Sequence, residues 1–420
     1  MEKLAIDGGK PVRTAPFPTH VLGASLIGKE ELNELTDVVF EKSPFRFYGI
    51  GNPVKVKTFE EMFTKRLGCK YALAVSSGSA ALLCSIAAIG VGPGDEVIIP
   101  SFGWYSDYCV LVAMGVTPVF ADIGDDLNID PIDFERKITK KTRAVIPIHY
   151  QGGPAKMDKI VEIARSHNLM IIEDCAQALG GSYQGRLLGS FGDIAITSFQ
   201  THKMITSGEG GVLFTNNEEF YVRAIRYHDL GFVRPFFEPG LVNKRLASRA
   251  ESFAGIQFRM SELQGAFLCA QFRRLDYILD TCRSAQRRIR KHLINNPNFS
   301  IRYEEGDCGL AFIMLMPTKE KADQFSVAMN AEGIPCGPTS FCCNLVAEYP
   351  IKTKAMVNPN MAPFGRGYDG ENITYDVAAI CPNTDDYVAR FVAIGIGPLY
   401  KEQEIDDILM AVDKVSSAIF

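Results

Sequence analysis

Short apolar runs alternate with helix-forming stretches through the first half of the chain, and this alternation is the strongest constraint on its fold. The runs are rich in Val and Ile and cover residues 71–75, 96–100, 118–121, 144–148, 170–173 and 194–199. Helix-like stretches lie between most of them, such as residues 80–88, 105–113 and 157–167. Near-continuous apolar strands that alternate with helices predict a mostly parallel sheet with both faces covered. The sequence therefore favours an α/β fold.

The pattern changes after residue 214. A helix is expected at residues 218–227, an irregular basic stretch at 229–249 and a long helix over 260–292. Strands at residues 310–316 and 392–395 and helices at 319–332 and 402–415 follow, which is typical of a smaller α+β domain. We expect a large domain over residues 1–285, with an arm over 1–30, and a small C-terminal domain over 286–420.

Composition argues against several classes of protein. The 44 basic and 49 acidic residues give a net charge of −5, without the basic excess that nucleic-acid binding needs. The longest apolar stretch, residues 80–91, is shorter than the ~20 residues of a membrane span. No signal-peptide pattern, C-x-x-C pair or zinc-type histidine spacing occurs. We expect a cytoplasmic enzyme with reduced thiols, and no metal, membrane or nucleic-acid partner.

A small, hydroxyl-rich turn follows the first apolar run. Residues 76–82 read Ser-Ser-Gly-Ser-Ala-Ala-Leu and lead into a predicted helix. Ligands of open α/β sheets bind beyond the carboxyl ends of the strands, and a helix N-terminus there attracts anions. The turn therefore indicates a phosphate site with Ser79 as a ligand. The alternative is an N-cap turn without a ligand.

An acidic residue ends the apolar run at residues 170–173. Asp174 is unusual near a phosphate site unless a cationic group faces it. A protonated pyridine nitrogen would be such a group, and Gln177 could reach a neighbouring ring substituent. The alternative is that Asp174 caps the next turn.

A lysine follows the run at residues 194–199. Lys203 is expected in a loop between two buried strands, where partial desolvation lowers the pKa of an amine and makes it available to an aldehyde. The glycines of residues 208–211 allow a flat ligand to approach the backbone closely. Most lysines are solvated and idle. Together, however, Ser79, Asp174 and Lys203 meet the requirements of pyridoxal 5′-phosphate (PLP).

These stretches resemble a known family. SSGSAAL, GVGPGDEVIIPSF, EDCAQA, SFQTHKMITSGEGG and GIQFRMSELQGA are similar to sequences of the DegT/DnrJ/StrS family, from about residue 59 to 271. Its members are fold-type I, PLP-dependent aminotransferases that act on keto sugars and keto cyclitols. The resemblance implies a seven-stranded, mostly parallel sheet.

The resemblance also implies roles for individual residues. Lys203 matches the lysine that binds the cofactor aldehyde, Asp174 the partner of the pyridine nitrogen and Gln177 the residue near the ring hydroxyl. The matches to phosphate ligands are Gly78, Ser79 and Ser198. Trp104 falls where the family places an aromatic ring on the cofactor face, although a lone Trp is often only packing. His149 is a candidate substrate contact or a structural histidine.

One departure concerns the subunit interface. Gln257 stands where the family usually has an asparagine that reaches the cofactor phosphate of the neighbouring subunit. Arg259 matches a family arginine and is a candidate for an anionic group, or else it forms a salt bridge at a helix start. The family implies a homodimer with shared active sites, to which Gln257 and residues 229–249 would contribute.

The expected function is transfer of an amino group from glutamate or glutamine to the carbonyl of a keto sugar, keto sugar acid or keto cyclitol. The opening GGKPVRTAPFP resembles family members that act on cyclitols, whereas residues 45–48 and the tail CPNTDDYVARFVAIGIGP resemble members that aminate an eight-carbon sugar acid. The alternatives are an aromatising family member that forms an aminobenzoate and a non-catalytic PLP-binding module. A related dehydratase carries His in place of Lys203, so the sequence argues against that activity.

Overall fold

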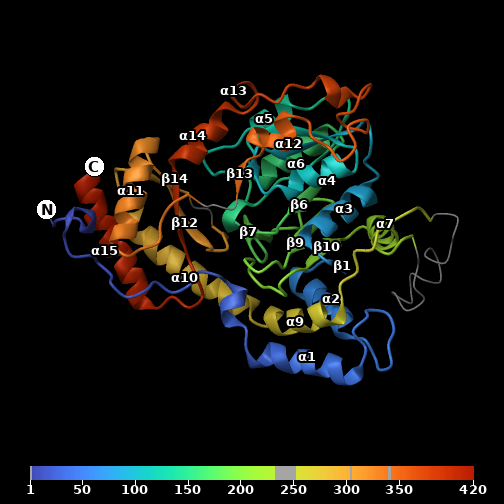
Figure 1. Ribbon diagram of the computed structural model, residues 1–420, viewed down its shortest axis with the longest axis horizontal. Helices are drawn as coiled ribbons and strands as arrows, with labels where there is room; N and C mark the ends of the chain where they lie inside the picture. The colour runs from blue at the N-terminus through green and yellow to red at the C-terminus, as the bar shows by residue number, and fades with distance from the viewer. Residues whose placement is uncertain (1, 232–251, 303–304, 339–341) are drawn as a thin grey trace.

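A seven-stranded sheet forms the centre of the larger lobe (Figure 1). The computed structural model describes residues 2–231, 252–302, 305–338 and 342–420. The strands are β1 (Tyr71–Val75), β2 (Glu96–Pro100), β4 (Thr117–Ala121), β5 (Thr142–Val145), β6 (Met170–Asp174), β9 (Ile194–Ser198) and β10 (Gly211–Thr215). Their order is β1-β10-β9-β6-β5-β2-β4, and β10 alone runs antiparallel to its neighbours. The predicted α/β fold with a mostly parallel sheet is confirmed.

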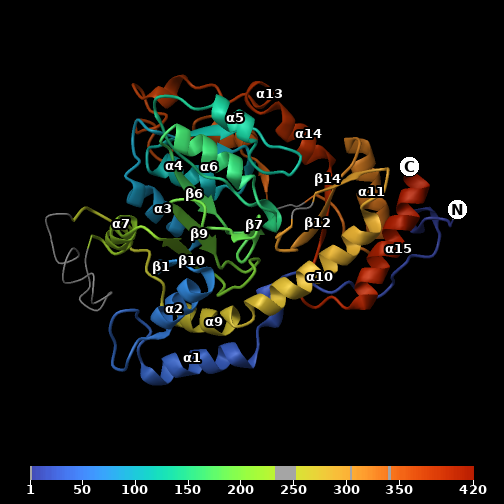
Figure 2. The same ribbon diagram turned by 180° about the vertical axis from the view of Figure 1, so that it is seen from behind.

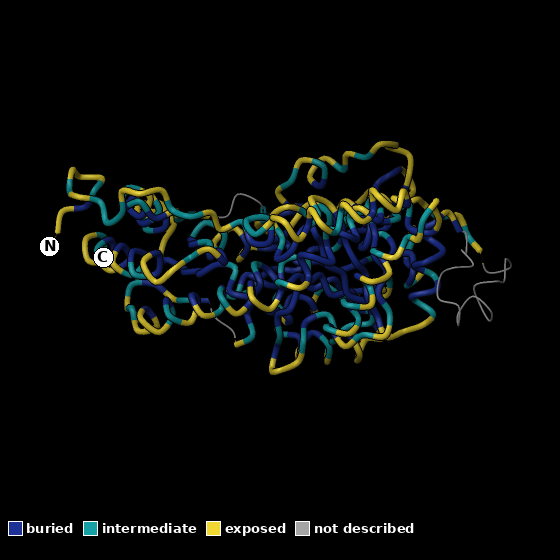
Figure 3. Tube along the Cα trace, turned by 90° about the horizontal axis from the view of Figure 1, so that it is seen from below, coloured by how far each residue is buried: buried dark blue, intermediate teal, exposed yellow. Residues whose placement is uncertain are grey.

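Helices cover both faces of this sheet because successive strand residues point to opposite sides. In β1, Leu73 and Val75 face the core under α3 (Gly78–Ile89), α4 (Ser106–Ala113) and α7 (Glu218–His228). Ala72 and Ala74 face the opposite core. The helices of that second layer are α2 (Lys55–Leu67), α5 (Pro131–Arg136), α6 (Met157–Ser166) and α9 (Glu262–Phe272). Figure 3 shows the buried trace concentrated inside these layers.

The single helix predicted over residues 260–292 is wrong, because the structure has two helices there. α9 ends at Phe272, and α10 spans Leu275–Leu293. The backbone at Arg274 (φ −97°, ψ −1°) departs from regular helical geometry. The Arg274 side chain donates to the Leu26 carbonyl at 2.9 Å and pairs with Glu30 at 3.1 Å, which ties the break to the segment around α1 (Lys29–Glu41). α10 then leaves the sheet and enters the smaller lobe (Figure 2).

The smaller lobe contains a three-stranded antiparallel sheet of β11 (Ser300–Arg302), β12 (Ala311–Leu315) and β14 (Phe391–Gly395). α10, α11 (Lys319–Ala331) and α15 (Glu402–Ile419) pack with it (Figure 1). The predicted strands and helices of this region are confirmed. β11 was not expected, because its three residues give too short a pattern to identify.

Residues 345–381 pack with the larger lobe, although they lie beyond the predicted boundary at residue 285. Leu345, Ile351 and Phe364 are buried in the core beneath α3 and α4. The short elements in or near this segment are β13 (Cys343–Asn344), which pairs with β3 (Phe102–Gly103), and α12 (Tyr349–Lys352), α13 (Val377–Ile380) and α14 (Pro382–Arg390). A separate hairpin joins β7 (Ser182–Tyr183) to β8 (Arg186–Leu187). The division of the chain at residue 285 stays a prediction.

The N-terminal arm lies along the smaller lobe, beside α11 and α15 (Figure 2). The fully buried Glu332 accepts hydrogen bonds from the backbone N–H of Ala5 at 2.8 Å and of Val12 at 3.0 Å. Its cationic partner is Lys414, whose Nζ lies 2.9 Å from the carboxylate. One carboxylate therefore holds the arm against the lobe. Among the described residues, no helix has the length and hydropathy needed to cross a bilayer.

We expect Glu332→Ala to destabilise the protein by about 3 kcal/mol, because it leaves a buried lysine and two backbone N–H groups without their acceptor. Urea unfolding measures this change. The matched control is Glu320→Ala, an exposed position on the same helix, which should cost less than about 1 kcal/mol. Equal effects of the two variants would contradict the role of Glu332 in holding the arm.

Candidate active site

The carboxyl ends of β1, β6 and β9 meet at one edge of the sheet. β1 and β9 both pair antiparallel with β10, so they run in the same direction. This edge opens on a cavity of about 790 Å³, which the small lobe and the N-terminal arm also line. The predicted residues that line it are Gly78, Ser79, Trp104, Asp174, Gln177, Ser198 and Lys203. His149, Gln257 and Arg259 do not line it.

The start of α3 forms the anion-binding end of the cavity. Ser77 caps the helix and accepts the N–H of Ala80 at 3.1 Å, while the other N–H groups of the first turn have no acceptor within the helix. The Ser79 hydroxyl lies 2.7 Å from that of Ser106, on α4. A Cβ on Gly78 would lie 2.9 Å from the Cβ of Ser198, so a glycine is needed for this close approach. The predicted phosphate site gains a third hydroxyl, Ser106, which the sequence did not single out.

Lys203 lies on a tightly bonded loop between β9 and β10. The N–H of Phe199 donates to the Gly210 carbonyl at 2.8 Å, and the Thr206 hydroxyl donates to the Phe199 carbonyl at 2.8 Å. Gly208 has φ +81°, a conformation that favours glycine. Met204, which directly follows Lys203, is buried and anchors the loop. The loop therefore holds the lysine toward the cavity with little freedom.

Two buried carboxyl groups lie side by side near this lysine. Asp174 is 6% exposed and accepts the N–H of Ala176 at 2.7 Å. Burial raises the pKa of Asp174, and the Ala176 N–H and the Lys203 ammonium oppose that shift. Asp107, in the first turn of α4, is 1% exposed, lines the same cavity and interacts electrostatically with Asp174. Burial, and then the charge of Asp174, raise the pKa of Asp107 well above its ordinary value of 3.8.

Asp107 was not predicted from the sequence. The available signal was a carboxylate beside the apolar helical run at residues 108–113. Such a residue usually caps a helix, so the type of residue alone could not identify the contact with Asp174.

Gln177 and Trp104 both line the cavity. The Gln177 side chain accepts the N–H of Gln151 at 3.0 Å and donates to the Cys342 sulfur at 3.7 Å. Burial raises the pKa of Cys342 to about 11, and the nearby Lys203 ammonium opposes that shift. Trp104 is 44% exposed and lies along the cavity wall, where its ring is accessible to a bound ring.

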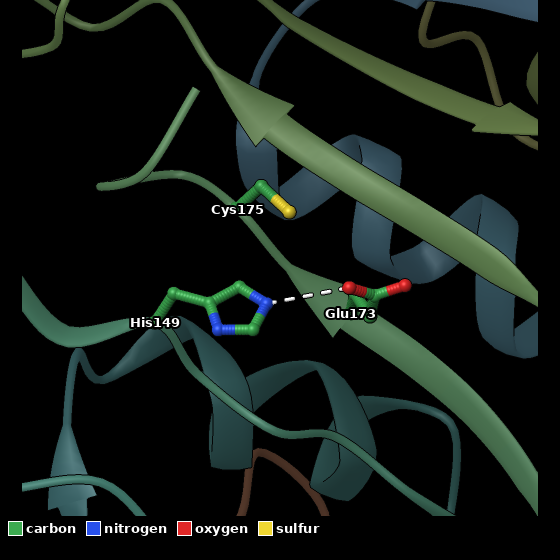
Figure 4. Close-up of side chains that lie close together, drawn as sticks. All are labelled: His149, Glu173 and Cys175. Carbon is green, nitrogen blue, oxygen red and sulfur yellow. Dashed lines mark hydrogen bonds and ion pairs between the residues drawn. The ribbon is translucent and has the colours of Figure 1, made fainter. Parts of the chain in front are cut away.

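His149 lies outside the cavity, contrary to the predicted substrate contact. Its ring is fully buried; Nδ1 accepts the N–H of Ala155 at 3.1 Å and Nε2 lies 3.4 Å from Glu173 (Figure 4). Because Nδ1 accepts, the proton of the neutral ring is on Nε2 and faces the carboxylate. The geometry fits the alternative of a structural histidine that ties β6 to the chain after β5.

The same histidine forms a cluster with Glu173 and Cys175 whose ligand atoms lie within 4.8 Å of one another (Figure 4). These atoms are already engaged. Glu173 accepts three backbone N–H groups, those of Gly189, Phe191 and Gly192. Burial raises the pKa of Cys175 well above its ordinary value, so it stays a thiol. The cluster is not a suitable metal site.

Arg259 and Gln257 lie outside the cavity of this chain. Arg259 pairs with Asp229 and lies 5.0 Å above the ring of Phe45, which matches the salt-bridge alternative rather than a contact with a bound anion. Gln257 is exposed, and its backbone pairs with that of Asp229. Its contact with a partner subunit stays a prediction. Of the stretch 229–249, residues 232–249 lie outside the described residues.

The cavity is also lined by residues that were not among the predicted site residues. They come from the arm, the Lys203 loop and the small lobe, and include His20, His202, Glu209, Asn330 and Tyr400. Burial and the neighbouring His202 lower the pKa of His20, which keeps this ring neutral. These residues are far apart in sequence, so only the tertiary structure brings them together.

The chain resembles known proteins over most of its length. Residues 27–360 match the model of the DegT/DnrJ/EryC1/StrS aminotransferase family. The "Putative L-glutamine:3-amino-2,3-dideoxy-scyllo-inosose aminotransferase" of Micromonospora echinospora is 38% identical over 290 residues, which are 68% of this chain but only 64% of that relative. The spore coat polysaccharide biosynthesis protein SpsC of Bacillus subtilis is 31% identical over 397 residues, 92% of this chain and 94% of SpsC.

Solved structures share the fold. The crystal structure of 3-amino-5-hydroxybenzoic acid synthase aligns with a TM-score of 0.79 at 24% identity, over 97% of this chain and 100% of that one. At this identity the likeness concerns the fold alone. With the family model matching residues 27–360, the chain belongs to the DegT/DnrJ/EryC1/StrS family of PLP-dependent aminotransferases.

Proposed function

We propose that the chain transfers an amino group from glutamine or glutamate to the carbonyl of a keto sugar, a keto sugar acid such as an 8-keto octulosonate, or a keto cyclitol, in amino-sugar biosynthesis. The observation that carries this proposal is that Lys203, Asp174 and the N-terminus of α3 follow three different strands and face one cavity. The name of the Micromonospora relative, with L-glutamine and an inosose, supports glutamine as donor and a cyclitol as acceptor.

The residues present fit PLP. The hydroxyls of Ser79, Ser106 and Ser198 and the start of α3 offer donors for a phosphate. Asp174 offers a buried carboxylate for a pyridine nitrogen. Lys203 lines the same cavity as the two buried carboxyls, and the charge of its ammonium opposes the raised pKa of both.

When bound, PLP supplies an aldehyde that condenses with amines and a ring that accepts electron density from the adjacent carbon. The chain's own residues do the rest. Asp174 keeps a proton on the ring nitrogen, and Trp104 and Gln177 orient the ring. The Lys203 amine would take the proton from the donor α-carbon and deliver it to the carbon of the cofactor's aldehyde group, as general base and then acid. Walls from both lobes and the arm exclude water from this transfer.

We expect excess glutamine or glutamate, without any acceptor, to abolish the aldehyde-bound absorption band of the holoenzyme and to release one keto acid per site. Lys203→Ala should show no borohydride-trapped cofactor and a turnover reduced by about 10³-fold or more, because it removes both the amine and the proton carrier. Lys159→Ala, an exposed position on α6, is the matched control.

An unchanged band with both donors would contradict the proposed function. It would favour the non-catalytic or the aromatising alternative, which product analysis then separates. Undiminished turnover of Lys203→Ala would contradict the assigned role of the lysine.

We expect Gly211→Ala to weaken PLP binding by about tenfold or more. A Cβ there would lie 2.4 Å from the Ser77 carbonyl, so the start of α3 would have to move away from the phosphate. Gly92→Ala is the matched control, because a Cβ at that position meets nothing within 4 Å. The measurement is cofactor affinity by fluorescence titration of the cofactor-free protein. Equal affinities of the two variants would contradict the placement of the phosphate.

A homodimer is part of the proposal. Large apolar side chains are exposed on α1 and on the loop that follows it, namely Val39, Phe40, Tyr48 and Ile50. An exposed apolar patch of this kind is typical of a protein interface. Light scattering should give twice the 46.3 kDa chain mass, and Phe40→Glu should give the single chain, whereas Ile132→Glu, an exposed site on α5, should not. A monomeric wild type would contradict this part of the proposal.

A further inference from the structure

A second buried carboxyl group accompanies the one expected to face the ring nitrogen. Asp107 and Asp174 both line the cavity, and both are almost fully buried. They come from different elements, the first turn of α4 and the end of β6. The adjacent residue on α4, Ser106, contacts Ser79 at the anion-binding end. One turn of α4 therefore reaches both ends of the expected cofactor.

The Asp107 carboxyl lacks the partners that a buried carboxylate needs. No donor among the described residues lies within hydrogen-bond reach of its Oδ1. The carboxyl that lies next to it is that of Asp174, and the electrostatics of each group depend on the other. Two carboxylates in contact repel each other strongly in a buried site, so such pairs retain one proton. A protonated Asp107 can donate to Asp174, which removes the repulsion.

We propose that Asp107 is a positioning residue that shares one proton with Asp174 and so fixes the direction in which Asp174 faces the cofactor's ring nitrogen. This inference rests on the PLP site of the proposed function. The shared proton leaves a single negative charge on the pair, which matches the single positive charge of a protonated pyridine. Without the hydrogen bond from Asp107, the hydrogen-bond donor that remains for the Asp174 carboxyl among the described residues is the Ala176 N–H, at 2.7 Å.

Several titratable groups face the pair and contribute to its charge. They are Lys203 from the β9–β10 loop, His149 beside β6, Cys175 directly after β6, Cys342 next to β13 and Cys109 on α4. Lys203 is the cationic member, and it opposes the raised pKa of both carboxyls. A bound cofactor aldehyde would change the charge of Lys203, and the hydrogen bond from Asp107 would then be more important for Asp174.

Asp107→Asn and Asp107→Leu separate the hydrogen bond from mere packing. Asn keeps a donor toward Asp174 and cannot titrate, whereas Leu keeps the volume and loses the donor. In the holoenzyme, infrared spectroscopy should show one protonated aspartic acid at neutral pH that is lost in both variants. Nitrogen-15 NMR of ring-labelled PLP should show the wild-type, protonated signal in Asp107→Asn and a shifted signal in Asp107→Leu.

In kinetics, too, Asp107→Asn should stay closer to the wild type than Asp107→Leu. We expect Asp107→Leu to lower kcat by about tenfold or more with little change in the donor KM, and Asp107→Asn to restore most of it. An acid whose pKa is raised by folding holds its proton more tightly in the folded protein. The protonated Asp107 therefore stabilises the folded protein at low pH, and this contribution is lost as the pH rises above 3.8, the ordinary pKa of an aspartic acid. As the pH rises above 3.8, the melting temperature of the wild type should fall relative to that of Asp107→Asn.

An unchanged infrared band in Asp107→Asn, or identical NMR signals and kcat values in the Asn and Leu variants, would overturn the proposal. The infrared and NMR measurements need bound PLP but no turnover. A failure of the amino-transfer function would therefore leave them informative, and the two failures can be told apart.

Discussion

The antiparallel pairing of β10 between β1 and β9 determines where the site lies. Because β10 reverses the chain direction between them, the ends of β1 and β9 and the start of β10 at Gly211 all lie at one edge of the sheet. The start of α3 and the Lys203 loop are therefore brought together by backbone hydrogen bonds rather than by side chains. The close contact between Gly211 and the Ser77 backbone leaves no room for a Cβ.

The buried charges near this edge have two different functions. Glu173 accepts three backbone N–H groups and faces His149, so it organises the chain after β6 without reaching the cavity. The next residue, Asp174, points to the other side of the strand, as strand geometry requires, and faces the cavity. The alternation of the strand thus separates two consecutive carboxylates into one that binds backbone N–H groups and one that lines the cavity.

Much of the larger lobe was predictable, because buried parallel strands have continuous apolar runs. The candidate site residues follow the ends of these runs. Ser79, Asp174 and Lys203 were found in this way. The prediction failed where the decisive contact is tertiary. The helix break at Arg274 depends on pairing with α1, and the burial of His149 depends on Glu173. In the sequence Asp107 has only the features of an ordinary residue at a helix start, and its proximity to Asp174 is visible only in the structure.

The same distinction divides the cavity. Part of its lining comes from strand ends, each within a few residues of a recognisable motif, whereas another part comes from His20 of the arm and Asn330 of the small lobe. The position of the arm depends on the carboxylate of Glu332, which is remote in sequence from the arm and from the strand ends. Residues of the arm and the small lobe can therefore change without disturbing the sheet edge.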